Sequence, residues 1–501
     1  MIEKIISSLL SYGLDKGLFH KRDVIYVKNA YIELFKLKEC EVILEKNSYE
    51  YSDDILQEAW EYAQNNNLES SIGETKDIAC TKIMSVMLPF PSVVETAFYQ
   101  MEKAHGIKSA LNHYYHLSIA SNYIKMRDIL KNIGWKSETE YGNLEITINL
   151  SKPEKDPKEI AKALTATNSS YPLCLLCTEN EGFSGDFNKP ARQNHRIIEL
   201  ELLGELWYFQ YSPYVYYQEH SIVLSGRHKP MVISELTFRK LFAFLERVPH
   251  YMVGSNADLP IVGGSILSHE HFQAGNYEFP MFRAEKIAEY SNNSHPNLRI
   301  TLLKWPMSVI RLIGCKESCI QLGSEILAAW RNYSDKEMQI LSHTGETPHN
   351  TITPILRRLE TGEYSFDLVL RNNRQTAEHP LGLFHPHSEH HHIKKENIGL
   401  IEVMGLAILP GRLENEVGEI ENLLNYPEKM PSEALFAHGE WILYLKKNYT
   451  KIESSKAFVQ AEIGKKFLKV LENCGVFPQT QLGAIHFDKF LKTLNLERIH
   501  K

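Results

Sequence analysis

The sequence of 501 residues lacks any hydrophobic run long enough to cross a membrane. No stretch approaches the ~20 consecutive apolar residues that a membrane-spanning helix needs. The opening residues, Met1-Ile2-Glu3-Lys4, show no basic segment followed by a long apolar core, so we expect no signal peptide. Low-complexity segments and short-period repeats are absent as well. We therefore expect a globular protein without a membrane partner.

Cysteine is scarce, and basic residues are outnumbered by acidic ones. Seven cysteines are an odd number in a long chain, which argues against a disulfide framework and for the reducing cytoplasm. The net charge of −7 argues against nucleic acid as the main partner, because a phosphate backbone needs a basic face. A local basic pocket for a small phosphorylated ligand is compatible with this charge.

The length predicts two to four domains, since domains usually have about 100–200 residues. Apolar residues recur at helical spacing near both ends of the chain and over residues 233–245, whereas residues 144–150 alternate apolar and polar side chains as a strand does. Charged residues 152–162, with two prolines, predict a connector. A mixed α/β fold is expected, divided into an N-terminal helical region, two half-domains and a C-terminal helical region: 1–140, 141–290, 291–412 and 413–501.

The 22 histidines of the chain are clustered, and this is the first indication of a functional site in the composition. If residues 269–273 form a strand, His269, His271 and Gln273 share one face. The preceding Gly263-Gly264-Ser265 would let backbone N–H groups approach an anion. An imidazole can attack phosphorus and later leave, and an amide can stabilise phosphoryl oxygens. A lone His-x-His pair is more often structural, but the added glutamine and glycines favour a nucleophile at His271.

Cys174-Leu175-Leu176-Cys177 presents two thiols at a spacing that chelates zinc. Two further ligands are needed for a tetrahedral site, and His228 and His269 are the candidates. The alternative is a pair of buried cysteines without metal. A bound zinc with four protein ligands would be structural, because no coordination position stays open for substrate.

A second histidine cluster covers residues 379–392 and contains the pair His385-Pro386-His387. The two His-x-His pairs suggest a diverged duplication, with both pairs on equivalent strands. Six histidines in this stretch fit a metal site, whereas Lys394 and Lys395, which follow at once, fit a phosphate neighbour. Both alternatives are open at this point.

Several nearly contiguous stretches between about residues 85 and 415 carry a specific resemblance. In chain order they are Asn194-His195-Arg196, Ser212-Pro213-Tyr214, Glu219-His220, His228-Lys229-Pro230-Met231, Gly254-Ser255-Asn256-Ala257-Asp258-Leu259-Pro260, His271-Phe272-Gln273, Phe384-His385-Pro386-His387 and Lys394-Lys395-Glu396-Asn397-Ile398-Gly399. Together they resemble the galactose-1-phosphate uridylyltransferases, in the long class found in Gram-positive bacteria. The better-studied short class looks like a distant relative.

The resemblance implies two antiparallel half-barrels of the histidine-triad type with added helices at both ends. It implies uridylylation of His271 with Gln273 beside it. It also implies a zinc site at Cys174, Cys177, His228 (with His220 as the rival) and His269, and substrate contacts at Asn194, Asn256, Ser265 and Lys395. His385 and His387 match an iron site of the short class and are further candidates for substrate contact. The third histidine of that iron site falls near Asn373, which is a departure, and Glu285 is the candidate for its glutamate. The second metal is therefore left open.

The implied reaction exchanges uridylyl groups between UDP-glucose and galactose 1-phosphate in cytoplasmic galactose use, by a ping-pong mechanism. The resemblance further implies a homodimer. A histidine-triad hydrolase or phosphorylase is the first alternative, but such hydrolases usually carry a third histidine where Gln273 stands. A metal-binding scaffold is the second, and it gives no reason for the glycines before His269.

Overall fold

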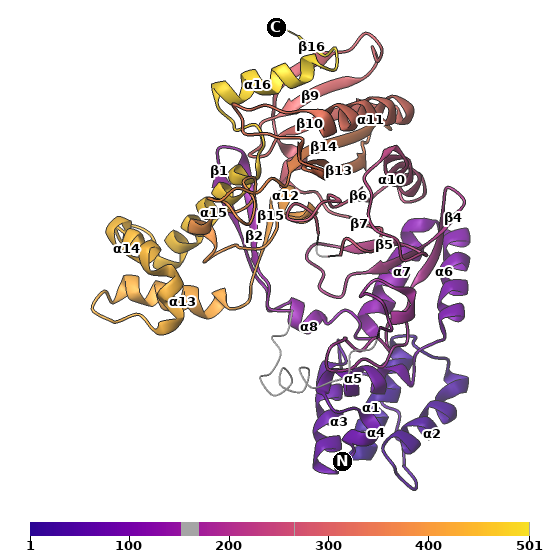
Figure 1. The fold of residues 1–501 in the computed structure, drawn as a ribbon. Coiled ribbons are helices and arrows are strands. Elements are labelled where there is room, and N and C mark those ends of the chain that lie inside the picture. Colours follow the sequence, from indigo (N-terminus) through magenta and orange to yellow (C-terminus); the bar gives the residue numbers. More distant parts are fainter. Residues whose placement is uncertain (152–169, 265, 500–501) are drawn as a thin grey trace. The chain divides into compact units, whose positions relative to one another are not determined.

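The computed structural model describes residues 1–151, 170–264 and 266–499 (Figure 1). It divides the chain into two compact units, Met1–Lys131 with Ser151–Lys229 and Asn132–Leu150 with Pro230–Lys501. The predicted connector at 152–162 and Ser265 lie outside the described residues.

Helices dominate the first unit. In the first of them, Ile5, Ile6, Leu9 and Leu10 all lie in the core, as their spacing predicts. Gly106, with φ +83°, ends one helix and begins the next, a conformation that glycine adopts without strain. The helices are α1 (Ile2–Asp15), α2 (Val24–Leu34), α3 (Asp53–Asn65), α4 (Glu69–Ile72), α5 (Lys76–Ser85), α6 (Pro91–His105), α7 (Ile107–Ala120) and α8 (Met126–Ile129).

An antiparallel meander completes the first unit, formed by β3 (Ile198–Leu202), β4 (Glu205–Tyr211) and β5 (Ser221–Ser225). β3 alternates buried and exposed residues strictly, so only one of its faces is covered. Leu203 and Gly204 both have positive φ, which gives the two-residue turn the twist that an antiparallel pair prefers.

The second unit contains a run of antiparallel strands in the order β16-β8-β9-β10-β14-β13-β6-β7. Helices α10 and α11 pack against β6, β13, β14 and β10 (Figure 1). The elements are α10 (Glu235–Arg247), β6 (Met252–Gly254), β7 (His271–Gly275), β8 (Lys286–Ser291), β9 (Arg299–Leu303), β10 (Val309–Gly314), α11 (Lys316–Asn332), β13 (Asn350–Arg358), β14 (Tyr364–Asn372) and β16 (Glu497–Arg498).

A smaller sheet of the second unit has the order β1-β2-β15, with β15 parallel to β2. It consists of β1 (Ile133–Thr139), β2 (Gly142–Ile148) and β15 (Leu406–Leu409). The helices of this part are α12 (Leu400–Val403), α13 (Leu413–Asn425), α14 (Gly439–Asn448), α15 (Ser455–Cys474) and α16 (Gln481–Lys492), and α15 packs on β1 and β2.

The expected mixed α/β architecture with helical ends and antiparallel strands is confirmed. The helix expected from Ile233 is α10, which begins at Glu235 behind a capping box formed by Ser234 and Thr237. Within the described residues, no helix has the length and apolar character to cross a membrane.

Candidate active site

His271 begins the strand β7, next to β6 in the sheet of the second unit. Gly254, the last residue of β6, faces Gln273 in the antiparallel register. The chain that follows Gly254 therefore leaves the sheet at the end where His271 enters it. The expected strand over 269–273 starts only at His271, so His269 precedes the strand.

The imidazole of His271 is oriented by its own backbone. Its Nδ1 lies 2.7 Å from the carbonyl oxygen of His269. A carbonyl only accepts, so Nδ1 carries the proton and Nε2 carries the lone pair. Among the described residues, Nε2 has no hydrogen-bond partner. Burial lowers the pKa of His271 to about 4, against a smaller opposing effect of the His269 carbonyl, so the ring is neutral at neutral pH.

Gln273 lies two residues farther along β7, and strand alternation gives it the same face as His271. Its Oε1 is buried and has no hydrogen-bond partner in the described part of the chain. A buried amide without a partner is costly to keep, and a bound ligand can satisfy it. Because the oxygen and nitrogen of an amide are interchangeable by rotation, Gln273 can also present a donor.

The loop after β6 folds tightly around Asn256. Added side-chain atoms at Gly263 would lie 2.5 Å from the Ala257 carbonyl, and at Gly264 they would lie 2.5 Å from Asn256 Nδ2. A side chain at Gly263 would overlap a backbone carbonyl, and one at Gly264 would displace the Asn256 amide, so both positions favour glycine. Asn256 Oδ1 accepts a hydrogen bond of 2.8 Å from the backbone N–H of Leu400. The glycine loop is thereby joined to the first turn of α12.

The two lysines in the segment that leads into α12 lie in different environments. Lys394 is buried and donates to Glu402 Oε1 at 2.9 Å and to the Ile408 carbonyl at 3.2 Å. Lys395 is exposed to solvent. Of the pair, Lys394 therefore holds the fold, and Lys395 is the cation available to an anionic ligand.

His385 is buried beside this segment, with Nε2 3.2 Å from Asn397 Oδ1 and Nδ1 3.2 Å from the Pro386 carbonyl. Burial lowers its pKa. His387 Nε2 lies 3.0 Å from the Leu383 carbonyl, and its ring stacks on His379 at 4.1 Å. These histidines hold the loop and precede a short 3₁₀ turn, Ser388–His390. The expectation that this pair lies on a strand equivalent to β7 is wrong.

The histidines of 379–392 form no group of three metal-ligating side chains among the described residues. Asn373, near the place of the third expected ligand, instead accepts a hydrogen bond through Oδ1 from His349 Nδ1 at 2.8 Å. Glu285 has an exposed side chain near Lys304. No arrangement in the described second unit thus supports the second metal.

Cys174, Cys177 and His228 come together in the first unit. The two Sγ atoms are 3.5 Å apart, and Cys177 Sγ is 3.1 Å from His228 Nδ1. The N–H of Leu176 points at Cys174 Sγ, and Asn180 ties the Cys174 and Cys177 carbonyls together at 2.8 Å each. Thiols and an imidazole at these separations suit zinc, and the group could hold a metal ion.

His220, the rival of His228, packs instead against the rings of Tyr216 and Tyr217. Asn194 is also in the first unit, where its Nδ2 donates to the Ser121 carbonyl at 2.9 Å. His269 is buried in the second unit.

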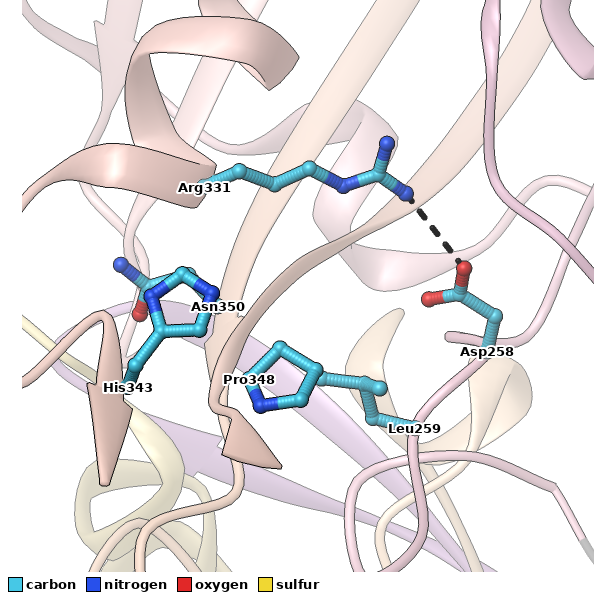
Figure 2. A pocket seen from close by; sticks show the side chains of 6 residues that line it. All are labelled: Asp258, Leu259, Arg331, His343, Pro348 and Asn350. Carbon is cyan, nitrogen blue, oxygen red and sulfur yellow. Dashed lines mark hydrogen bonds and ion pairs between the residues drawn. The ribbon is translucent and has the colours of Figure 1, made fainter. Parts of the chain in front are cut away.

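A cavity of about 210 Å³ lies beside the loop that follows β6, lined by Asp258, Leu259, Arg331, His343, Pro348 and Asn350 (Figure 2). Asp258 accepts from the Ile233 N–H at 2.8 Å and pairs with Arg331 at 3.5 Å. These contacts fix the loop from behind. The sequence offered no sign of them, since the partners of Asp258 are distant along the chain.

Two family models cover most of the chain. The model described as galactose-1-phosphate uridyl transferase, N-terminal domain, matches residues 17–230, and the model of its C-terminal domain matches residues 245–433. The galactose-1-phosphate uridylyltransferase of Clostridium acetobutylicum is 50% identical over 499 residues, covering 99% of this chain and 100% of that protein. This chain belongs to the galactose-1-phosphate uridylyltransferase family.

The same enzyme of Caldanaerobacter subterraneus subsp. tengcongensis is 47% identical over 509 residues, covering 99% of this chain and 98% of its own. A solved structure, that of yeast Ap4A phosphorylase Apa2, aligns at 11% identity with a TM-score of 0.35, covering 77% of this chain and 98% of that chain. Membership of the uridylyltransferase family makes the chain a nucleotidyltransferase, as the motifs predicted.

Proposed function

We propose that this uridylyltransferase moves a uridylyl group from UDP-glucose to galactose 1-phosphate through a covalent intermediate on Nε2 of His271. The observation that carries this assignment is the hydrogen bond between His271 Nδ1 and the His269 carbonyl. It commits the lone pair of a neutral imidazole to Nε2, which is the state a nucleophile needs. The full-length similarity to named uridylyltransferases supports the reaction class.

In the first half-reaction, the Nε2 lone pair attacks the α-phosphorus of UDP-glucose. A phosphorus–nitrogen bond forms, and the bond from that phosphorus to the bridging oxygen of the β-phosphate breaks. Glucose 1-phosphate leaves with the bonding electrons. The proton on Nδ1 stays on the ring, so the uridylylated imidazole is cationic and is itself a good leaving group.

In the second half-reaction, a phosphate oxygen of galactose 1-phosphate attacks the same phosphorus. The phosphorus–nitrogen bond breaks, UDP-galactose forms, and His271 regains its lone pair. One pocket serves both sugar phosphates, which avoids holding two repelling anions in line. Gln273, the neighbouring amide on the strand face, would stabilise the phosphoryl oxygens, and Lys395 would neutralise a phosphate. Asn194, Asn256 and Ser265 are proposed substrate contacts from their motifs.

His269 is the proposed fourth ligand of a structural zinc, together with Cys174, Cys177 and His228. When bound, zinc would fix its ligands in tetrahedral geometry without taking part in the transfer. The hydrogen bond from the Leu176 N–H to Cys174 Sγ supports this proposal, because a backbone N–H that donates to a cysteine sulfur orients the thiol for metal binding.

The finer architecture is also proposed: half-domains 141–290 and 291–412 correspond to two half-barrels, between the helical regions 1–140 and 413–501. The strand order β14-β13-β6-β7 supports it. In this order β13 of the half-domain 291–412 pairs with β6 of the half-domain 141–290, and each has its other antiparallel neighbour within its own half-domain. A homodimer, implied by the resemblance, completes the proposal.

The test is a single-turnover experiment with UDP-glucose whose α-phosphorus is labelled. We expect about one equivalent of glucose 1-phosphate per site and a labelled, acid-labile protein, with the label on His271. Addition of galactose 1-phosphate should discharge the label as UDP-galactose, and a panel of sugar 1-phosphates would define the acceptor range. Discharge to water or phosphate at the same rate would favour a hydrolase or phosphorylase. A label on another histidine would contradict the assignment.

A further inference from the structure

A lysine lies inside the apolar face of α10. Lys240 is 1% exposed, and its neighbours on the same helix, Phe238, Leu241 and Phe244, are fully buried. An ammonium group in such a setting is strongly unfavourable unless a charged partner and hydrogen bonds compensate it. Lys240 therefore needs a specific partner.

That partner is Glu270, the residue between His269 and His271. The Nζ atom of Lys240 lies 3.2 Å from Glu270 Oε1 and 3.3 Å from Oε2. The Glu270 side chain is itself only 9% exposed, so the pair is almost completely withdrawn from water. In this environment the attraction is stronger and more directional than at a surface.

The ion pair lies next in sequence to the strand that carries the proposed nucleophile. Glu270 directly precedes β7, and its side chain is joined to α10 by the ion pair. Helix α10 packs against β6, the strand next to β7. Lys240 thus reaches Glu270 from α10, a helix that supplies none of the proposed substrate-binding residues.

We infer that Lys240 and Glu270 are positioning residues for His271, acting through the peptide group that joins His269 to Glu270. The carbonyl of this peptide is the group that orients the His271 ring at 2.7 Å. The peptide plane is fixed at its Glu270 end by the ion pair to α10. If the pair is lost, the carbonyl can tilt, and the imidazole loses its single tautomer and its aim at phosphorus.

The inference rests on the proposed role of His271 as nucleophile. Lys240→Met keeps the length and apolar character of the side-chain stem but removes the charge. We expect the rate of the first half-reaction to fall about 100-fold, as small misplacements of reacting groups do, with KM for UDP-glucose changed less than about twofold. Lys240→Arg keeps the charge and the donors, and it should recover most of the rate. Glu270→Gln, which keeps size and hydrogen bonding, should have an intermediate effect and covers the case in which Lys240→Met does not fold.

The second unit offers a matched control in Arg311 and Asp367, a buried pair that joins β10 to β14 with distances of 2.6 and 2.7 Å. Arg311→Met should lower Tm comparably but leave the half-reaction rate of the folded protein within about twofold. The ¹⁵N shifts of His271 give a direct readout: the wild type should show protonated Nδ1 only, and Lys240→Met should show a mixture of both tautomers.

A folded Lys240→Met variant with the wild-type rate and a single tautomer would overturn the inference. So would an Arg311→Met variant that loses the same rate at the same Tm. Failure of the proposed function looks different, since wild-type protein would then release no glucose 1-phosphate or carry the label elsewhere.

Discussion

Two His-x-His segments of the second unit have the same tripeptide pattern, but their imidazole rings have different hydrogen-bond contacts. In the first, His271 uses one ring nitrogen on a backbone carbonyl and has no hydrogen bond at Nε2 within the described structure. In the second, His385 has an acceptor oxygen 3.2 Å from each ring nitrogen, and His387 is held by the Leu383 carbonyl and by stacking on His379. Within the described residues, the fold therefore leaves different ring nitrogens without a contact in the two segments, and the residue pattern alone does not determine which.

Replacing the proposed nucleophile should have the largest effect. His271→Asn cannot form the phosphorus–nitrogen bond, so turnover should fall by at least about 10⁴-fold and the burst of glucose 1-phosphate should disappear. Burst amplitude by rapid quench measures this, and circular dichroism checks that the fold persists. A burst that survives in His271→Asn would remove the contrast between the two segments.

The second largest effect is expected at Gln273, since its buried Oε1 has no partner among the described residues. Gln273→Ala should reduce the rate of uridylylation by about 10²–10³-fold, as the loss of one oxyanion donor does. Gln273→Glu keeps the shape but adds a negative charge beside the phosphate, and it should be slower still. A rate for Gln273→Ala within threefold of wild type would show that Gln273 has no part in the transfer.

The corresponding change in the second segment should be mild for chemistry. His385→Gln keeps a donor toward Asn397, and we expect a full burst, with turnover reduced less than about tenfold. The free energy of unfolding should fall by about 1–2 kcal/mol, because a buried polar contact is imperfectly replaced. Single-turnover kinetics and urea unfolding of the same preparation separate the two quantities. Complete loss of the burst would give His385 a role in the reaction.

Cys177→Ser tests the proposed zinc site, to which His269 of the first segment would contribute the fourth ligand. The variant should bind less than one equivalent of zinc and unfold at lower urea concentration, while molecules that stay folded keep their burst. Metal content by mass spectrometry and the urea midpoint measure this. The exposed Cys315→Ser is the control, and it should change neither quantity. A wild-type protein purified without zinc would refute the metal site.

The smallest effect at neutral pH is expected for His392, whose ring stacks on Trp441 at 5.4 Å. Burial lowers its pKa to about 3, with smaller contributions from the positive charges of Lys466 and Arg412 and from His438 and His390. A depressed pKa stabilises the fold above the unfolded value of about 6.5, and this stabilisation is lost as pH falls toward 3. His392→Phe should therefore lose less stability than wild type between pH 7.5 and 5, measured by urea unfolding.

Local patterns predicted the helical ends, the helix α10 and the strand β2, since their side-chain periodicity reflects burial on one face. The choice of His228 over His220 was also predictable, because the residues around His228 match the family. The strand expected for His385 was wrong, since Pro386 has no N–H for a ladder and the histidines bind nearby carbonyls instead.

The ion pair of Lys240 with Glu270 was not predictable. A lysine in an apolar helix is ordinarily read as a solvated residue, and its partner is 30 positions away along the chain. Asn397 belongs to a motif of the sequence, but its contact with His385 is recognisable only in the folded loop. Contacts between distant segments decide such roles, and a single sequence does not encode their distances.

The carbonyl that orients His271 belongs to the main chain, two residues before the ring it holds. In a catalytic triad the orienting group is a side chain from another segment, and one substitution can delete it. No substitution deletes a backbone carbonyl, so the first segment contains the proposed nucleophile and its orienting group as one unit. Such a tripeptide can tolerate extensive change in the surrounding protein, provided that the plane of one peptide bond keeps its tilt.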